Sequence, residues 1–167
     1  MEITLDRLLA SREVRASFQR ELLDRFPGKT LICLTVIMPG KVKRNTQSLI
    51  VSQAALTALI ARFGSDILYF CARDLETGFE AYLLTSLPND EAKRAVCDIE
   101  DNHPLGRLFD MDVIAADGTP VSRQSIGRDP RRCLVCGNEA RFCMRNRTHS
   151  SEELMARIDE MIGEYVQ

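Results

Sequence analysis

Residues 31–38 read Leu-Ile-Cys-Leu-Thr-Val-Ile-Met, the longest apolar run of the chain, and Pro-Gly pairs at residues 27–28 and 39–40 bound it. A short apolar run that contains β-branched residues and lies between turn signals is typical of a buried strand. The run is far shorter than the roughly 20 apolar residues that a membrane-crossing helix needs. We therefore expect a buried strand at residues 31–38 and no membrane-spanning segment.

The segments around this strand alternate between helical and strand periodicity. The expected elements are helix 3–26 (which can break into two), helix 46–63, strands 66–72 and 79–85, helix 88–101, strand 108–115, a short return strand 119–122 after an Asp-Gly turn, and a final helix that starts with the capping box Ser150–Glu153. From residue 31 to residue 115 the order is strand–helix–strand–strand–helix–strand, which matches the split βαβ, or ferredoxin-like, arrangement. The sequence thus predicts an α+β fold with a ferredoxin-like core and flanking N- and C-terminal helices.

Length and charge narrow the class of protein. The 167 residues suit one domain, residues 1–167, and such a chain should bury roughly 70% of its unfolded surface without disulfides. The net charge of −2 argues against a nucleic-acid or membrane coat, and the absence of an apolar signal core at the start leads us to expect a cytoplasmic protein. Charge is uneven, because residues 123–147 hold seven arginines and two acids, a local +5 against −7 elsewhere. A basic Cys/His-containing segment, residues 123–149, therefore separates the last strands from the final helix.

Asp110 and Asp112, in the last long strand, are the first candidates for chemistry. Residues two apart on a strand project to the same face, and neighbouring carboxylates repel unless a cation lies between them. Mg²⁺ commonly takes one or two carboxylates, completed by substrate phosphates and water. His103, Gly106 and Arg107 lead into this strand, where Gly106 allows close backbone approach and Arg107 can clamp a phosphate. The alternative is a solvated strand face.

The basic segment holds a second candidate in the pattern Cys133-x2-Cys136-x6-Cys143-x5-His149. Three thiolates and an imidazole are a valid tetrahedral Zn²⁺ set, and the neighbouring arginines favour thiolates. The spacing differs from that of a common zinc finger, so a reduced, partly buried set of cysteines is the alternative to structural zinc. The other three cysteines stand singly in apolar surroundings, and we expect them to be core residues: Cys33, Cys71 and Cys97.

Arginines around Pro130 are a third candidate. Arg128, Arg131 and Arg132 form either a solvated basic face or, beside paired carboxylates and a metal, the charge that polyphosphate transfer requires. The loop Pro-Gly-Lys-Val-Lys at residues 39–43 can add a further phosphate contact through Lys43.

Three stretches carry a family resemblance: His-Pro-Leu-Gly-Arg-Leu-Phe-Asp-Met-Asp-Val (103–113), Pro-Arg-Arg-Cys-Leu-Val-Cys (130–136) and Cys-Met-Arg-Asn-Arg-Thr-His (143–149). Together they resemble the citrate lyase holo-acyl-carrier-protein synthases, also called apo-citrate lyase phosphoribosyl-dephospho-CoA transferases (the CitX family). The resemblance extends to residues 8–15 and 39–43. Lys41 and Asp129 stand where the family is expected to have proline, and neither departure touches the paired aspartates.

The resemblance implies a nucleotidyltransferase-type enzyme with a nucleotidyltransferase-like core. Such an enzyme transfers the prosthetic group of triphosphoribosyl-dephospho-CoA to a serine of the acyl carrier (γ) subunit of citrate lyase and releases diphosphate. We expect Asp110 and Asp112 to hold Mg²⁺ across the phosphates and Arg107 to stabilise developing charge. The residues expected to bind the donor are Lys43, Gly106, Arg128, Arg131 and Arg132. Asp112 and His103 are both candidates for the general base.

Two other classes of function are weighed against this enzyme. One is a non-catalytic, zinc-stabilised basic module that binds nucleic acid or an acidic protein, and the other is a subunit that only scaffolds a lyase complex. The binding module gives the paired aspartates no function. Only 6% of the residues are aromatic and none is Trp, so the chain offers few side chains on which nucleic-acid bases could stack. We therefore expect no nucleic-acid partner, and we expect the arginines to help dock an acidic acyl carrier protein.

Overall fold

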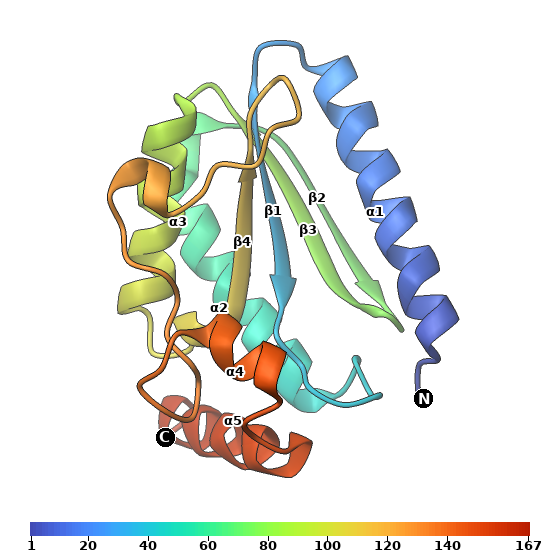
Figure 1. Ribbon diagram of the computed structural model, residues 1–167. Helices are drawn as coiled ribbons and strands as arrows, with labels where there is room; N and C mark the ends of the chain where they lie inside the picture. The colour runs from blue at the N-terminus through green and yellow to red at the C-terminus, as the bar shows by residue number, and fades with distance from the viewer.

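The computed structural model describes all residues, 1–167, and consists of a four-stranded antiparallel sheet with helices on both faces (Figure 1). Its elements are α1 (Leu5–Arg25), β1 (Thr30–Val36), α2 (Thr46–Phe63), η1 (Gly64–Asp66), β2 (Ile67–Leu75), β3 (Gly78–Thr85), α3 (Asn89–Asn102), η2 (Gly106–Leu108), β4 (Phe109–Ile114), η3 (Gln124–Ile126), α4 (Ala140–Asn146) and α5 (Ser151–Tyr165), where η marks a 3₁₀ helix. The predicted α+β class is confirmed, and the strands and long helices lie close to their predicted bounds.

The strands are arranged in the order β2-β3-β1-β4, and every neighbouring pair is antiparallel. One face of the sheet carries the larger core, which α2, α3 and α5 cover with apolar side chains such as Val51, Val96 and Ile158. On the other face only α1 packs, through Leu22 over a smaller apolar cluster (Figure 1). The face under α1 is therefore the less completely covered of the two.

Strand register divides the α1 face into rows of different polarity. Across β3, β1 and β4 the three rows are Leu84–Leu31–Ile114, Tyr82–Cys33–Asp112 and Glu80–Thr35–Asp110. The apolar row lies under the C-terminal half of α1, where Leu22 is 1% exposed. The polar row lies toward the N-terminal half, where Arg15 pairs with Glu80. Side chains two apart on a strand share a face, so each row follows from the alternation of the sequence once the register is fixed.

Two predicted features differ in the structure. The segment predicted as helix 3–26 forms one continuous helix, α1, over Leu5–Arg25, which Thr4 caps by accepting a hydrogen bond from the Arg7 N–H at 3.3 Å. The predicted return strand 119–122 is reduced to a single bridge between Ile114 and Pro120. Hydrogen bonds from the Ala115 N–H to the Thr119 carbonyl and from the Val121 N–H to the Val113 carbonyl flank this bridge, and beyond them the chain leaves β4, where Arg123 pairs with Glu100 and Asp101 of α3.

α2 is apolar enough by length and composition to cross a membrane, with a mean hydropathy of 1.3 over its most apolar 18 residues. Its apolar character is accounted for by packing, because it lies across β1, β3 and β4. Seven of its residues are buried: Ser48, Val51, Ser52, Ala54, Ala55, Leu59 and Phe63.

The three single cysteines behave largely as predicted. Cys33 and Cys97 are buried, at 4% and 0% exposure, whereas Cys71 on β2 is half-buried. Burial first, and then the charge of Asp112, raise the pKa of Cys33 to about 12. This thiol therefore stays protonated beside the candidate site.

Candidate active site

Asp110 and Asp112 project from β4 on the α1 side of the sheet, because the alternate residues Phe109, Met111 and Val113 fill the core on the other side. This is the shared face that their spacing predicts. Oδ2 of Asp110 accepts a hydrogen bond from the Thr35 hydroxyl at 3.3 Å. Partial desolvation, and then the negative charge of Asp110, raise the pKa of Asp112. The pair therefore carries negative charge that the fold does not fully neutralise.

Glu80 lies in the same row as Asp110 and is 2% exposed. It is held by Arg15 of α1, whose Nε lies 3.0 Å from Oε1, and by the Tyr82 hydroxyl, which donates to Oε2 at 2.6 Å. Sequence reasoning missed this triad, because only the register brings β3 into line with β4. A charged residue inside the apolar stretch 79–85 was the available signal.

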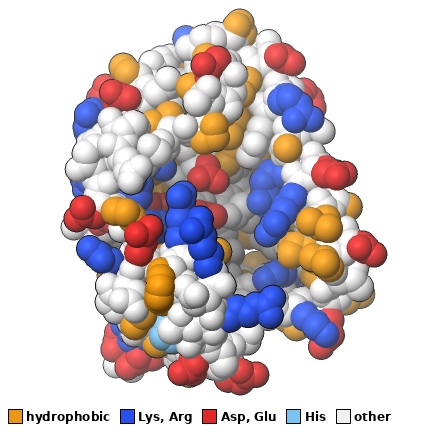
Figure 2. Space-filling view, viewed as in Figure 1, with side chains coloured by type: hydrophobic (Ala, Val, Ile, Leu, Met, Phe, Trp, Pro, Cys, Tyr) orange, Lys and Arg blue, Asp and Glu red, His pale blue; other side chains and the backbone are white.

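Basic groups from α1 and the 40–43 loop border the same face. Nζ of Lys43 donates to the Met38 carbonyl at 2.6 Å, and burial first, then the nearby charge of Arg12, lower the pKa of Lys43. Ser11, one helical turn before Arg15, has a buried hydroxyl without a hydrogen-bond partner. Figure 2 shows the molecule hollowed between α1 and the segment around α4, with Lys and Arg side chains on both sides of the hollow and acidic side chains in its upper part.

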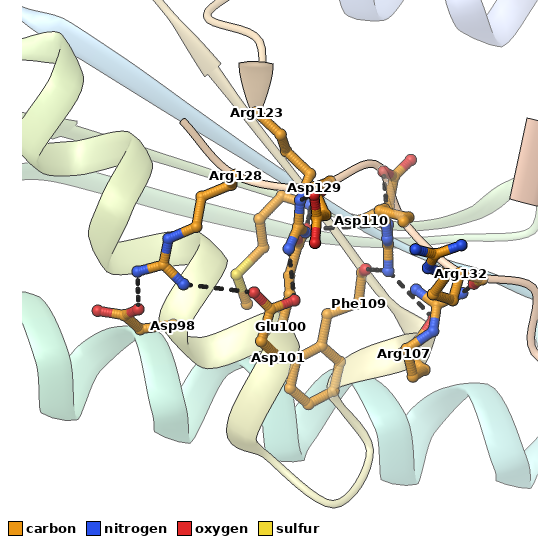
Figure 3. Close-up of polar contacts among 12 residues, drawn as sticks. Asp98, Glu100, Asp101, Arg107, Phe109, Asp110, Arg123, Arg128, Asp129 and Arg132 are labelled. Carbon is orange, nitrogen blue, oxygen red and sulfur yellow. Dashed lines mark hydrogen bonds and ion pairs between the residues drawn. The ribbon is translucent and has the colours of Figure 1, made fainter. Parts of the chain in front are cut away.

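The outer edge of β4 is closed by charged side chains rather than by another strand (Figure 3). Oε1 of the buried Glu100 accepts the Met111 N–H at 3.0 Å, and Oε2 accepts from Arg123 at 2.8 Å. Arg131 donates to the Phe109 carbonyl at 2.6 Å. An open edge exposes unpaired N–H and C=O groups, so this network both satisfies the strand and fixes the residues on it.

Arg131 connects that edge to the aspartates. Its Nη1 lies 3.4 Å from Oδ1 of Asp110 and 3.8 Å from Glu100, while its Nε is buried without a partner. Arg107 approaches from η2 and donates to the Arg132 carbonyl, and burial first, then the charge of Arg131, lower its pKa. The Arg132 side chain is exposed and has no ion-pair partner. The structure thus brings Arg131, which was predicted to bind the donor, into contact with Asp110. Arg107, which was predicted to stabilise developing charge, contacts the backbone of Arg132 and accepts from Arg131 through its own carbonyl.

Three predicted site residues lie elsewhere. Arg128 binds α3, with Nη2 at 2.5 Å from Asp98, and so anchors the loop before the cysteines (Figure 3). Gly106 is buried against the end of α3, where a Cβ would stand 2.3 Å from a carbonyl oxygen, so its close approach is to protein backbone. His103 packs on the opposite side of β4, with its ring 4.9 Å from Phe109. Burial lowers the pKa of His103, and its Nδ1 accepts the Leu105 N–H at 3.0 Å.

The cysteine–histidine group is assembled as its spacing suggested. The ligand atoms of Cys133, Cys136, Cys143 and His149 all lie within 4.8 Å of one another. The backbone N–H of Asn138 first, and then His149, lower the pKa of Cys136 to about 6, whereas desolvation raises the pKa of Cys143 to about 11. Among the His, Cys, Asp and Glu side chains, this is the group of three or more whose ligand atoms lie close enough to surround one ion.

Comparison with known proteins agrees with the motifs. The family model described as apo-citrate lyase phosphoribosyl-dephospho-CoA transferase matches residues 3–165. A relative from Vibrio cholerae serotype O1 (strain M66-2), named "Probable apo-citrate lyase phosphoribosyl-dephospho-CoA transferase", is 40% identical over 169 residues, which cover 99% of this chain and 94% of that protein. A relative with the same name from Streptococcus pyogenes serotype M18 is 34% identical over 167 residues, which cover 98% of this chain and 87% of that protein. Protein CitXG of Haemophilus influenzae is 36% identical over 163 residues, which are 96% of this chain and 35% of that protein. The chain belongs to the apo-citrate lyase phosphoribosyl-dephospho-CoA transferase family.

Proposed function

We propose that the chain transfers the prosthetic group of triphosphoribosyl-dephospho-CoA to a serine of the acyl carrier subunit of apo-citrate lyase. Family membership and the names of the relatives support the reaction. The observation that carries the proposal is the aspartate pair on the α1 face of β4, where Arg131 contacts Asp110 and Arg15 pairs with Glu80 in the same row. This distribution of charge suits a substrate that contains a phosphoanhydride.

We further propose that the sheet and its two crossover helices form a ferredoxin-like core of nucleotidyltransferase type. The strand order β4-β1-β3-β2, with α2 between β1 and β2 and α3 between β3 and β4, supports this assignment. In this arrangement β4 is an edge strand next to the central β1, so its aspartates are open to a substrate.

The aspartates fit Mg²⁺. Two carboxylates share one face, Asp112 makes no ion pair, and each side chain stays accessible. Two carboxylates completed by phosphate oxygens and water are a common Mg²⁺ set. Asp110 and Asp112 would hold the ion, which when bound would offset charge on the leaving diphosphate.

The remaining side chains position the donor and move the proton. Arg131 and Arg107 face the leaving diphosphate from the β4 side, and Lys43 binds the donor from the opposite rim. The carrier serine oxygen forms a bond to the phosphorus next to the ribose, and the phosphoanhydride bond breaks with its electron pair on diphosphate. The serine proton passes to the carboxylate oxygen of Asp112 that does not hold the ion. His103 is separated from this face by β4, which disfavours it as the base.

Docking of the acyl carrier protein would use the exposed arginines of the basic segment. Arg123, Arg128 and Arg131 are engaged within the fold, which leaves four exposed arginines without ion-pair partners: Arg132, Arg141, Arg145 and Arg147. Acyl carrier proteins are usually acidic, and complementary charge speeds and orients association.

Incubating the purified chain with the donor, Mg²⁺ and the apo acyl carrier protein, and then weighing the carrier, tests the reaction directly. We expect a mass gain of one phosphoribosyl-dephospho-CoA group, which is lost when the acceptor serine is replaced by alanine. Asp110→Asn should abolish the gain, and Asp98→Asn on α3 is the matched control that should retain it. A carrier that binds the chain but gains no mass would instead support a binding module or a scaffold subunit.

A further inference from the structure

The proposed transfer reaction leaves the cysteine–histidine group of residues 133–149 without a role. Cys136 Sγ lies 3.5 Å from Cys143 Sγ and 3.4 Å from His149 Nε2, and Cys133 Sγ completes a set within 4.8 Å. Tetrahedral Zn²⁺ binds thiolate at about 2.3 Å and imidazole at about 2.0 Å, which separates its ligand atoms by roughly 3.5–3.8 Å. The four donors are therefore spaced closely enough to surround one such ion.

A backbone N–H group is directed at one of the sulfur atoms. The Val135 N–H, two residues after Cys133, donates to Cys133 Sγ at 3.4 Å. Such outer hydrogen bonds orient metal ligands and stabilise negative charge on them.

The surrounding segment has little apolar core of its own. Val135, Phe142 and Met144 are 40%, 55% and 77% exposed, and Cys143 is the buried residue of α4. α4 has only seven residues, and isolated helices of fewer than about 12 residues are marginal in water. A cross-link between the turn, α4 and the start of α5 would supply the order that packing does not.

We propose that Cys133, Cys136, Cys143 and His149 bind one Zn²⁺ in a closed, structural site. Four protein ligands leave no open position for substrate, so the ion organises the segment rather than joining the transfer reaction. Two contacts tie α4 and the cysteine turn to the backbone of the neighbouring arginines: the Ala140 N–H donates to the Arg131 carbonyl at 2.8 Å, and Arg132 forms an isolated antiparallel β-bridge with Glu139. Zn²⁺ therefore fixes the backbone from which Arg131 reaches Asp110.

Elemental analysis of the full chain, purified under reducing conditions, tests the site. We expect one zinc per chain, and His149→Cys, which keeps four donors, should retain it. Cys136→Ser and His149→Ala should bind Zn²⁺ at least roughly a hundredfold more weakly. Cys71→Ser on β2 is the control for loss of a cysteine and should bind normally. Wild-type affinity in Cys136→Ser or His149→Ala would overturn the proposed ligand set.

Co²⁺ titration and hydrogen exchange supply readouts that do not depend on activity. Co²⁺ added to the metal-free, reduced chain should give the visible bands of a tetrahedral thiolate site, with one equivalent bound. Removing the metal should raise amide exchange in residues 133–149 while the sheet stays protected. Absence of both zinc and Co²⁺ binding, or a Cys136–Cys143 disulfide found by mass spectrometry in the reduced-purified protein, would overturn the proposal.

Discussion

Replacing Glu100 by glutamine tests how the charged network closes the edge of β4. Glu100 is 4% exposed, accepts the Met111 N–H at 3.0 Å and pairs with Arg123 at 2.8 Å. Glutamine keeps the size and the oxygen that accepts from Met111, but it removes the charge that faces Arg123 and Arg131. The substitution therefore isolates the ionic part of the network.

The magnitude follows from burial. Losing one partner of a buried ion pair typically costs about 3–5 kcal/mol, and a hydrogen bond to a charged group contributes about 1.5–3 kcal/mol. Arg123 keeps Asp101 as a second partner, so we expect Glu100→Gln to lower the free energy of unfolding by about 2–3 kcal/mol. At this chain length that corresponds to a fall in Tm of roughly 4–12 °C. Glu100→Ala should cost about 1–3 kcal/mol more, because the Met111 N–H is left without a partner.

Urea denaturation of both variants measures these differences, with Asp98→Asn as the control. Asp98 pairs with Arg128 where its side chain is 53% exposed, and exposed pairs contribute about 0–1 kcal/mol. The slope of unfolding free energy against urea should be unchanged in Glu100→Gln. The proposed closure of the β4 edge is refuted if Glu100→Gln loses no more stability than Asp98→Asn. It is also refuted if Glu100→Ala and Glu100→Gln have the same free energy of unfolding.

Three further predictions concern other parts of the structure. Gly106→Ala should destabilise the fold by about 3 kcal/mol or more in the same urea assay, because its Cβ would stand 2.3 Å from a carbonyl oxygen of α3, and wild-type stability would contradict this packing. The raised pKa of Asp112 means that the folded chain holds this proton at higher pH than the unfolded chain, so stability falls as pH rises from the ordinary value of 3.8 through the raised pKa. Asp112→Asn should remove this loss of stability, so the variant should be more stable than the wild-type chain at pH 7 although it fails in transfer. If the two proteins show the same dependence of stability on pH, the raised pKa of Asp112 is contradicted. The affinity of the chain for the acyl carrier protein should fall as the salt concentration rises. At low salt, the Arg141→Glu, Arg145→Glu double variant should bind the carrier more weakly than the wild-type chain, whereas Arg94→Glu on α3 should bind it normally. An affinity that does not depend on salt would exclude electrostatic docking.

Local pattern predicted the elements well, because apolar periodicity and turn residues act over short stretches. The spacing of Asp110 and Asp112 was enough to place them on one face, and the Cys-x2-Cys spacing was enough to group its thiols. Residues 119–122 form only a single bridge to β4, because the chain turns away after Val121, where Arg123 pairs with Glu100 and Asp101 of α3. α4 escaped prediction, since its seven residues are mostly polar or exposed and show no apolar face.

Long-range partners could not be predicted from the sequence. The alignment of Glu80 with Asp110 depends on the register of three strands, which no single stretch specifies. Arg128 and Arg131 look alike in the sequence, yet one binds α3 and the other reaches Asp110, because the loop between β4 and α4 turns between them. Gly106 was expected at a phosphate because glycine permits close approach, and the structure shows that the group approached is the end of α3.

Calorimetric titration of the donor into the chain, with and without Mg²⁺, tests most directly whether the two β4 carboxylates hold the ion across the phosphates. We predict that Mg²⁺ tightens donor binding to the wild-type chain by at least about tenfold, or about 1.4 kcal/mol, and that Asp110→Asn and Asp112→Asn lose this gain while Asp98→Asn keeps it. Equal Mg²⁺ dependence in all four proteins would contradict the central claim.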